Sequence, residues 1–322
     1  MSLIEQAAKR LEQLRQAGVE LPQEQAKAEP TLKHVDKPIH KSPSALFTEP
    51  VVERDRKPEP KIIEGRSDGD SAASSKSVVL NLEAIAASGL LVPNVARNQL
   101  ADELRVIKRP LIANAMGRGD SAVPNGNLIM VTSALPGEGK SFTAINLAIS
   151  IAMEMDNTVM LVDADVARPS VLNMLGLPPS NGLLDVLSNN SLDISGALLR
   201  TNIEKLSILP SGSPHSRATE LLASDTMNRL LEDMSRRYSD RIIIFDSPPL
   251  LLTTESRVLA THMGQVVVVV NAENTAQAAV KQAITTIEAC PLKMMVLNQV
   301  RSDKTDGYGY GYGYGYGQHH EA

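Results

Sequence analysis

The chain has 322 residues, of which 43% are hydrophobic and 21% are charged, and its net charge is −5. This composition allows one core of about 200–250 residues with extensions, and the acidic balance argues against nucleic-acid binding. The single cysteine, Cys290, excludes an internal disulfide and favours a reducing cytosol. Neither a stretch of 18 apolar residues nor a secretory signal occurs, so we expect a cytoplasmic chain without membrane spans.

The N-terminal part of the chain divides into two predicted segments. Residues 3–17 place apolar side chains at alternating steps of three and four, which predicts an amphipathic helix within residues 1–21. Its apolar stripe could contact a partner, lie on an anionic membrane surface, pack on the core or pair with itself. Residues 22–75 contain seven prolines among polar residues and are predicted to form a disordered linker before a folded domain at 76–306.

Two helices are predicted at the start of this domain. Residues 82–89 favour a short helix that ends at a glycine, and residues 97–109 favour a longer amphipathic helix. On the longer helix Asp102, Arg105 and Lys108 lie on one side, and we expect that side to face outward. It could form intermolecular ion pairs or be an ordinary solvated helix face.

A phosphate-binding loop is the strongest motif. Residues 134–141, ALPGEGKS, fit the pattern GxxxxGK[ST] with alanine in place of the first glycine. A strand is predicted at 128–132 and a helix from Phe142, which is the context that this motif requires. Lys140 is therefore expected to reach the β and γ oxygens of a nucleotide, and Ser141 to ligate Mg²⁺.

Carboxylates follow two further predicted strands. The segment TVMLVDAD ends with Asp163 and Asp165, and the segment RIIIFD ends with Asp246, as in a Walker B strand. Because ligands bind at the carboxyl edge of open α/β sheets, we expect these side chains near the phosphates and the metal. For Asp163 and Asp165 the alternative is a pair of solvated turn residues.

The remaining pattern indicates a doubly wound, mostly parallel α/β domain of the P-loop NTPase class. Further strands are predicted at 206–212, 265–270 and 294–298, and a helix at 217–237. Because the last two strands are fully apolar, we expect both of their faces to be covered.

The chain ends with a tyrosine-rich tail at 307–322. Five tyrosines alternate with glycines there, namely Tyr308, Tyr310, Tyr312, Tyr314 and Tyr316. Such a segment cannot bury a core and leaves its phenols exposed, so it is either a low-complexity sticky tail or an acceptor of phosphoryl groups from the ATP site.

Together these motifs resemble the bacterial tyrosine autokinases of capsule and exopolysaccharide synthesis over residues 78–322. The segments that carry the resemblance are SALPGEGKS, VDADVARP, IIIFDSPP and the terminal tyrosine cluster. The segments GYGYG and ELRVIKRP are most similar to the exosortase-associated branch. The fused membrane chain-length domain of many relatives is missing.

The resemblance implies ATP and Mg²⁺ as cofactors and a set of site residues. The implied nucleotide contacts are Gly137, Glu138, Gly139, Lys140, Ser141, Phe142, Arg168 and Asn298, with Asn298 at the adenine. The implied catalytic group is Lys140, Asp163, Asp165 and Asp246, with Asp163 helping to deprotonate the attacking tyrosine, and the implied metal ligands are Ser141, Asp163 and Asp246. The helix with Asp102, Arg105 and Lys108 resembles the family's Glu-x-x-Arg-x-x-Arg oligomerisation helix, with Asp and Lys as its end residues.

The resemblance also implies a homo-oligomer that phosphorylates its tail in trans to regulate exopolysaccharide polymerisation and export. The implied partners are a membrane chain-length determinant, or polysaccharide co-polymerase, which holds the kinase at the inner membrane, and a cognate tyrosine phosphatase. A ParA- or MinD-like ATPase switch is the alternative, but Leu135 occupies the position at which those switches carry a second lysine. A scaffold without kinase activity is a further alternative.

Overall fold

The structure is a computed structural model that describes residues 75–93, 98–117, 123–189, 191–237 and 241–301. All of them belong to one of two compact units into which the chain divides, Ser67–Ala322. The predicted N-terminal helix, residues 22–74 of the predicted linker, and the tyrosine-rich tail lie outside the described residues. No helix in the described ranges has the length and apolar character that crossing a membrane requires.

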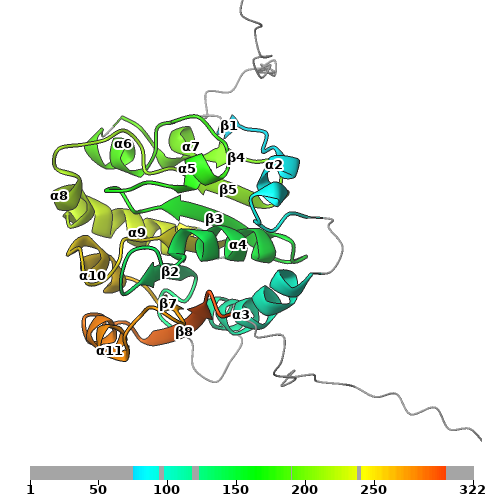
Figure 1. The fold of residues 1–322 in the computed structure, drawn as a ribbon. Helices are drawn as coiled ribbons and strands as arrows, with labels where there is room; N and C mark the ends of the chain where they lie inside the picture. The colour runs from blue at the N-terminus through cyan, green and yellow to red at the C-terminus, as the bar shows by residue number, and fades with distance from the viewer. Residues whose placement is uncertain (1–74, 94–97, 118–122, 190, 238–240, 302–322) are drawn as a thin grey trace, which may run out of the picture. The chain divides into compact units, whose positions relative to one another are not determined.

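One eight-stranded sheet organises the domain, with strand order β1-β4-β5-β3-β6-β2-β7-β8 (Figure 1). All neighbouring strands are parallel except β4 and β5, which confirms the predicted mostly parallel sheet. The strands are Lys76–Ser77 (β1), Leu128–Ser133 (β2), Thr158–Asp163 (β3), Leu199–Arg200 (β4), Leu206–Leu209 (β5), Arg241–Asp246 (β6), Gln265–Asn271 (β7) and Leu292–Asn298 (β8).

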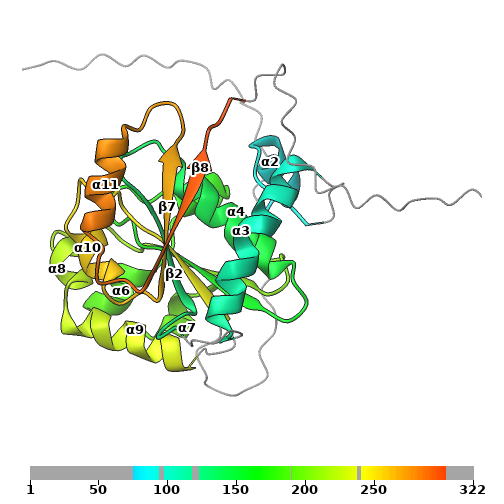
Figure 2. The same cartoon turned by 90° about the horizontal axis from the view of Figure 1, so that it is seen from below.

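Helices cover both faces of the sheet, as expected for a doubly wound domain. Figure 2 shows α2, α3 and α4 on one side of the strands and α9, α10 and α11 on the other. The helices are Leu82–Ala87 (α2), Gln99–Ala115 (α3), Lys140–Ala152 (α4), Val171–Met174 (α5), Leu183–Ser188 (α6), Ile194–Ala197 (α7), Ala218–Leu222 (α8), Asp225–Arg237 (α9), Glu255–Ala260 (α10) and Gln277–Thr285 (α11).

The central strands are apolar throughout because their alternate side chains enter two separate cores. In β2, Ile129 and Val131 pack with α3 and α4, whereas Leu128 and Met130 pack with the helices of the opposite face. All four side chains are fully buried. Strands that contribute to two cores read as continuous hydrophobic runs, which is why their positions could be predicted.

Residues 75–93 are part of the folded domain. The strand β1 pairs with β4, and the predicted short helix is confirmed as α2. The Asn202 side chain accepts a hydrogen bond from the Leu80 N–H at 2.8 Å and donates one to the Leu80 carbonyl at 3.1 Å. The buried Asn146 of α4 accepts from the Leu91 N–H at 2.6 Å. These side chains attach the segment to the sheet and to the helix that begins at the P-loop.

The predicted coverage of the last two strands is right for β7 and wrong for β8. Every residue of β7 is buried, whereas exposed and half-buried residues alternate along β8. Met295 and Leu297 are each 63% exposed. The strand β8 lies at the edge of the sheet, where only one of its faces, with Met294 and Val296, packs against the core. Hydrophobicity alone therefore overstated the coverage of this strand.

The structure also corrects the predicted side of α3. The helix continues through Pro110 to Ala115, and Lys108 is only 6% exposed, in line with the buried Leu104 and Leu111. Its ammonium donates to the Ser150 carbonyl at 2.6 Å and pairs with Glu154 at 2.7 Å. Lys108 therefore does not belong to an outward charged face.

Asp102 and Arg105 remain on the surface of α3. Their side chains are 52% and 41% exposed and form an ion pair at 2.6 Å. An exposed pair of this kind contributes little to stability, so these two residues alone make up what is left of the predicted charged face.

The predicted helix at 217–237 is two helices, α8 and α9. The break lies at Ser224, whose hydroxyl accepts a hydrogen bond from the Met227 N–H at 3.2 Å. A serine that accepts from the backbone three residues ahead is a typical helix N-cap, and it starts α9 at Asp225.

Candidate active site

The loop between β2 and α4 has the backbone that its glycines predict. Gly137 and Gly139 have φ angles of 82° and 93°, which side chains with a Cβ rarely adopt. A Cβ on Gly139 would also lie 2.2 Å from the Asn298 side-chain nitrogen. Glycine is therefore required at position 139 for two independent reasons, and the loop can present backbone N–H groups at the start of α4.

Neighbouring elements hold this loop in place through Glu138 and the end of β8. The Glu138 side chain is 2% exposed and accepts hydrogen bonds from the Leu135 N–H at 2.6 Å and from the Thr275 hydroxyl. The Asn298 amide donates to the Glu138 carbonyl at 2.9 Å. The Glu138 carboxylate is thus directed into the protein, so this residue can contact a nucleotide only through its backbone.

Three carboxylates and one ammonium gather at the carboxyl edge of the sheet. Lys140, the first residue of α4, places its ammonium 2.7 Å from Asp165 and 3.4 Å from Asp246. Asp163 and Asp246 are paired neighbours in the register of β3 and β6. The Ser141 hydroxyl lies 3.1 Å from the ammonium. The structure therefore brings together the predicted catalytic group, because parallel strands end at the same edge.

Burial changes the protonation of this group. Burial and the nearby charge of Asp246 raise the pKa of Asp163 to about 7. Burial, opposed by Lys140, raises the pKa of Asp246 to about 6. For Lys140 burial acts downward, but the charges of Asp246 and Asp165 and their hydrogen bonds outweigh it, so its pKa is raised. One ammonium does not fully compensate three buried carboxylates.

Two carboxylate oxygens in this cluster are buried without a hydrogen-bond partner. Asp163 accepts from the N–H groups of Ser170 and Val171, both at 3.1 Å, through Oδ2, and its Oδ1 has no partner. The same holds for Oδ2 of Asp246. Buried polar atoms are rarely left in this way, and unmodified proteins keep such atoms mainly where a ligand or ion binds.

These oxygens and the Ser141 hydroxyl fit a hard cation such as Mg²⁺, which prefers oxygen ligands. Within the described ranges, no group of three or more His, Cys, Asp or Glu side chains is arranged to hold a metal by itself. The donor set therefore suits an ion that is shared with phosphate oxygens, as magnesium usually is in nucleotide sites.

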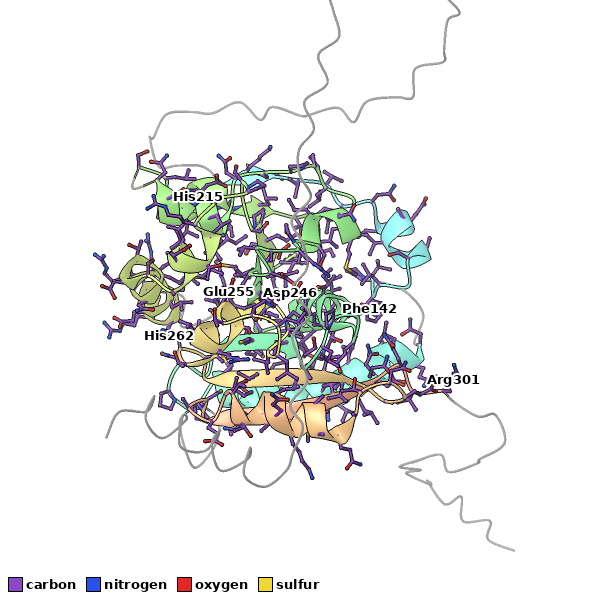
Figure 3. The ribbon with its side chains drawn as sticks, turned by 60° about the vertical axis from the view of Figure 1, so that its left-hand side comes forward. Phe142, His215, Asp246, Glu255, His262 and Arg301 are labelled. Atoms are coloured by element: carbon purple, nitrogen blue, oxygen red, sulfur yellow. The ribbon has the colours of Figure 1, made fainter. Side chains whose placement is uncertain are left out.

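A cavity of about 520 Å³ opens above the loop. Most of the predicted nucleotide contacts line it, namely Gly137, Gly139, Lys140, Ser141, Phe142 and Arg168, together with Asp165. Asn298 does not line this cavity, because its amide clamps the loop from the side of β8. Figure 3 shows Asp246 near the middle of the domain and Phe142 on α4, whereas His215 lies apart from them.

Sequence reasoning missed several residues of the site. The cavity is also lined by Ala167, Ser170 and Met174 and by the segment that follows Asp246, including Pro248, Pro249 and Leu252. The two prolines directly after the Walker B aspartate were a signal for a fixed loop at this edge. The partners of the buried Glu138 carboxylate had no signal, since Thr275 is far from it along the chain.

Two predicted features remain to be placed. The five tail tyrosines lie outside the described residues. Leu135, at the position of the second lysine of ParA- and MinD-like switches, packs partly buried against the core on the α9 side.

Comparison with known proteins connects this geometry to a family. Residues 126–299 match the family model described as an AAA domain. The chain is 33% identical over 182 residues to the tyrosine-protein kinase YwqD of Bacillus subtilis, a match that covers 56% of this chain and 75% of YwqD. It is 41% identical over 136 residues to the tyrosine-protein kinase CpsD of Streptococcus pneumoniae, covering 41% of this chain and 57% of CpsD.

Other relatives are longer, and the chain spans between 19% and 24% of the tyrosine-protein kinases from Acinetobacter johnsonii and Salmonella typhimurium. Among solved structures, the kinase domain of the Escherichia coli tyrosine kinase ETK matches with a TM-score of 0.58 and 23% identity. That match covers 70% of this chain and 88% of the domain, and it supports the fold.

Proposed function

Because the chain belongs to the bacterial tyrosine-protein kinases, we propose that it transfers the γ-phosphoryl group of Mg·ATP to tyrosines of its own C-terminal tail. In this reaction the phenolic oxygen forms a bond to the γ-phosphorus, and the bond from that phosphorus to the bridging oxygen breaks. The bridging oxygen leaves with ADP, and the phenolic proton passes to a carboxylate. Phosphoryl transfer needs mainly positioning and charge compensation, which a P-loop edge supplies.

The observation that carries this proposal is the position of Lys140 beside Asp165 and Asp246, at 2.7 and 3.4 Å, on the wall of a cavity at a P-loop. Lys140 would turn its ammonium toward the β and γ oxygens of the nucleotide. Ser141 and Asp246, with Asp163 next to them, would hold magnesium, which supplies positive charge at the transferred group.

Asp163 is the residue we assign to the phenolic proton. Its Oδ1 is buried and has no hydrogen-bond partner, whereas Oδ2 is held by the N–H groups of Ser170 and Val171. One oxygen is thus anchored and the other is available to a substrate hydroxyl, which is the geometry that a general base needs.

The remaining nucleotide contacts follow from the lining of the cavity. Gly137, Glu138 and Gly139 would contribute backbone N–H groups to the phosphates, and Arg168 would add a positive charge at the rim. Phe142 lies between this cavity and the one that contains Asn298, so both side chains would flank the base.

We assign the acceptor role to Tyr308, Tyr310, Tyr312, Tyr314 and Tyr316, in trans within a homo-oligomer. The glycines between them let an extended tail enter a neighbouring site at little steric cost. Each phosphate adds about −1.5 to −2 charges, so repeated transfer would progressively weaken the assembly and couple kinase state to exopolysaccharide polymerisation and export. A cognate tyrosine phosphatase would reset the tail.

The proposed location is the cytoplasmic side of the inner membrane, through a chain-length determinant of the polysaccharide co-polymerase type. The amphipathic pattern at residues 3–17 would be the docking element. Deleting residues 1–17 should then move the protein from the membrane fraction to the supernatant, and unchanged fractionation would contradict this role.

Two experiments test the kinase proposal. Purified full-length protein is incubated with Mg·ATP, and phosphate is mapped by mass spectrometry; we expect it on the tail tyrosines. ATP hydrolysis without phosphotyrosine would instead indicate a nucleotide switch. For the trans assignment, a Lys140→Ala chain with its tail is mixed with an active chain that lacks residues 307–317. Label on the inactive chain supports transfer between subunits, whereas its absence together with concentration-independent labelling of wild type means transfer within one subunit.

A further inference from the structure

A second cavity of about 350 Å³ adjoins the candidate active site. It has no lining residue in common with the first cavity, and the two meet at consecutive residues, since Pro169 lines the second and Ser170 the first. Asp163 lines only the second cavity. Its neighbours α5 and α6 lie in the half of the sheet away from β8 (Figure 1). Nothing in the reasoning above uses this space.

We propose that this cavity receives the phenol ring of the acceptor tyrosine. The proposal rests on the proposed kinase function and concerns the place where the acceptor binds. A phenol that enters from this side would reach the transferred phosphoryl group from the Asp163 side, while the nucleotide occupies the cavity above the P-loop.

The walls of the cavity match an aromatic ring with one polar end. They are largely apolar, with Leu172, Leu177, Pro179 and Pro214 among the lining residues. The polar end is Asp163, whose Oδ1 is buried without a partner and would accept a hydrogen bond from the phenolic hydroxyl. An apolar pocket with one placed polar group is the usual form of a site for such a ligand.

The depth of Asp163 accounts for a preference for tyrosine over serine or threonine. Asp163 is 1% exposed, so a hydroxyl must enter the cavity to reach it. The tyrosine oxygen lies a full ring further from the backbone than the serine oxygen, and a serine would have to bring its main chain between the prolines. The glycines on both sides of each tail tyrosine leave no side chain that would obstruct entry at the rim.

One wall of the cavity is built to keep its shape. Gly212 has a φ of 91°, and a Cβ there would lie 2.4 Å from the Asp185 carboxylate. That carboxylate accepts from the N–H groups of Gly182 at 2.8 Å and Ser213 at 3.0 Å. The Leu183 N–H donates to the Pro210 carbonyl at 2.7 Å. A wall fixed in this way is preorganised, which reduces the entropy lost when a ligand binds.

The opposite wall is continuous with the residues that orient Asp163. The N–H groups of Ser170 and Val171, which hold Oδ2, lead directly into α5. The chain then turns back, with the Leu177 N–H donating to the Leu172 carbonyl at 2.8 Å. The same short segment therefore anchors the carboxylate and forms the apolar wall, so the ring and the hydroxyl would be positioned together.

The test fills the cavity without changing any residue of the nucleotide site. Ser180 lines the cavity, whereas its neighbour Asn181 is exposed and does not. We expect full-length Ser180→Trp to phosphorylate a Lys140→Ala acceptor chain about 100-fold more slowly, as for a misplaced substrate, with unchanged affinity for Mg·ATP. Asn181→Trp is the matched control and should behave as wild type in both assays.

A binding measurement separates this proposal from the kinase activity. Saturation-transfer NMR with the peptide Gly-Tyr-Gly-Tyr-Gly should show ring signals with wild type and Asn181→Trp but not with Ser180→Trp. Should Ser180→Trp fail to fold, Leu177→Ala widens the cavity instead, and the KM for the acceptor chain should rise while the KM for ATP stays the same.

Normal acceptor phosphorylation and normal peptide signals in a folded Ser180→Trp would overturn the acceptor pocket and leave the kinase function intact. Wild-type protein that forms no phosphotyrosine would overturn the proposed function. In that case absent peptide signals would overturn the pocket as well, and present signals abolished only by Ser180→Trp would support it as a tyrosine site.

Discussion

The two ends of α4 each hold a buried lysine in opposite electrostatic situations. Lys140 is the first residue of the helix and faces three carboxylates, two of which have an unpartnered oxygen. Lys108 comes from α3 and meets the other end, where it pairs with Glu154 and the Ser150 carbonyl. A helix dipole disfavours a cation at its N-terminus and favours one at its C-terminus.

The difference shows which end is adapted for binding and which for stability. At the C-terminal end the lysine, the helix dipole and one carboxylate support one another, so the contact holds α3 against α4. At the N-terminal end the same type of residue is kept in place by an excess of buried negative charge, which costs free energy unless a cation or ligand compensates it. An arrangement of this kind is typical of functional sites.

The largest expected effect distinguishes the two lysines by activity. Lys140→Ala should lower phosphoryl transfer by at least about 100-fold, because backbone N–H groups alone do not replace its charge on the phosphates. Lys108→Met should keep nearly wild-type activity in its folded fraction. The rate of phosphotyrosine formation with Mg·ATP measures both, and an active, folded Lys140→Ala would rule out the assigned role.

The second prediction separates ATP binding from transfer at Asp163. Asp163→Asn should bind ATP and yet lose about 100-fold or more of the transfer rate, since an amide accepts no proton. Nucleotide affinity and phosphorylation are measured separately. Full transfer by this variant would refute the assignment of Asp163 as the proton acceptor.

The same variant should also be more stable than the wild type at high pH. The pKa of Asp163 is about 7 in the folded protein and near 3.8 ordinarily, so between these values the folded state holds more protons than the unfolded chain. The free energy of unfolding therefore falls as the pH rises through this range. Asp163→Asn avoids that loss and should gain about 1–4 kcal/mol at pH 8 without nucleotide or metal.

Thermal unfolding as a function of pH checks this effect, and Asp163→Asn and the wild type should converge as the pH falls toward 4. An advantage that is constant with pH, or a less stable variant at pH 8, would mean that the Asp163 carboxylate is not under electrostatic strain.

The smallest expected effect concerns the structural end of α4. Lys108→Met should lower the free energy of unfolding by about 1–3 kcal/mol, because the Ser150 carbonyl loses its side-chain partner and Glu154 its counter-ion. Arg236→Gln is the control, since Arg236 is 83% exposed and only 4.0 Å from Glu232, and it should change stability little. Urea unfolding of both variants decides, and equal effects would remove the distinction between the buried and the exposed pair.

The sequence by itself determined the elements and the residues of the candidate site. The P-loop glycines, Lys140, Asp163, Asp165 and Asp246 were predictable because strand and helix periods are local, and parallel strands that precede such residues end at one edge. The buried central strands were predictable for the same reason, since continuous hydrophobic runs of this length have few other uses in a P-loop domain.

Only the tertiary structure decided what covers each element and where each side chain is directed. It exposed Met295 and Leu297 on an edge strand, buried Lys108 against the end of α4, and directed the Glu138 carboxylate into the protein toward Thr275. It also formed the cavity beside Asp163 from segments that are distant in the chain. These features depend on contacts between elements, because a residue's pattern fixes the face it occupies on its own helix or strand but not the neighbour that this face meets.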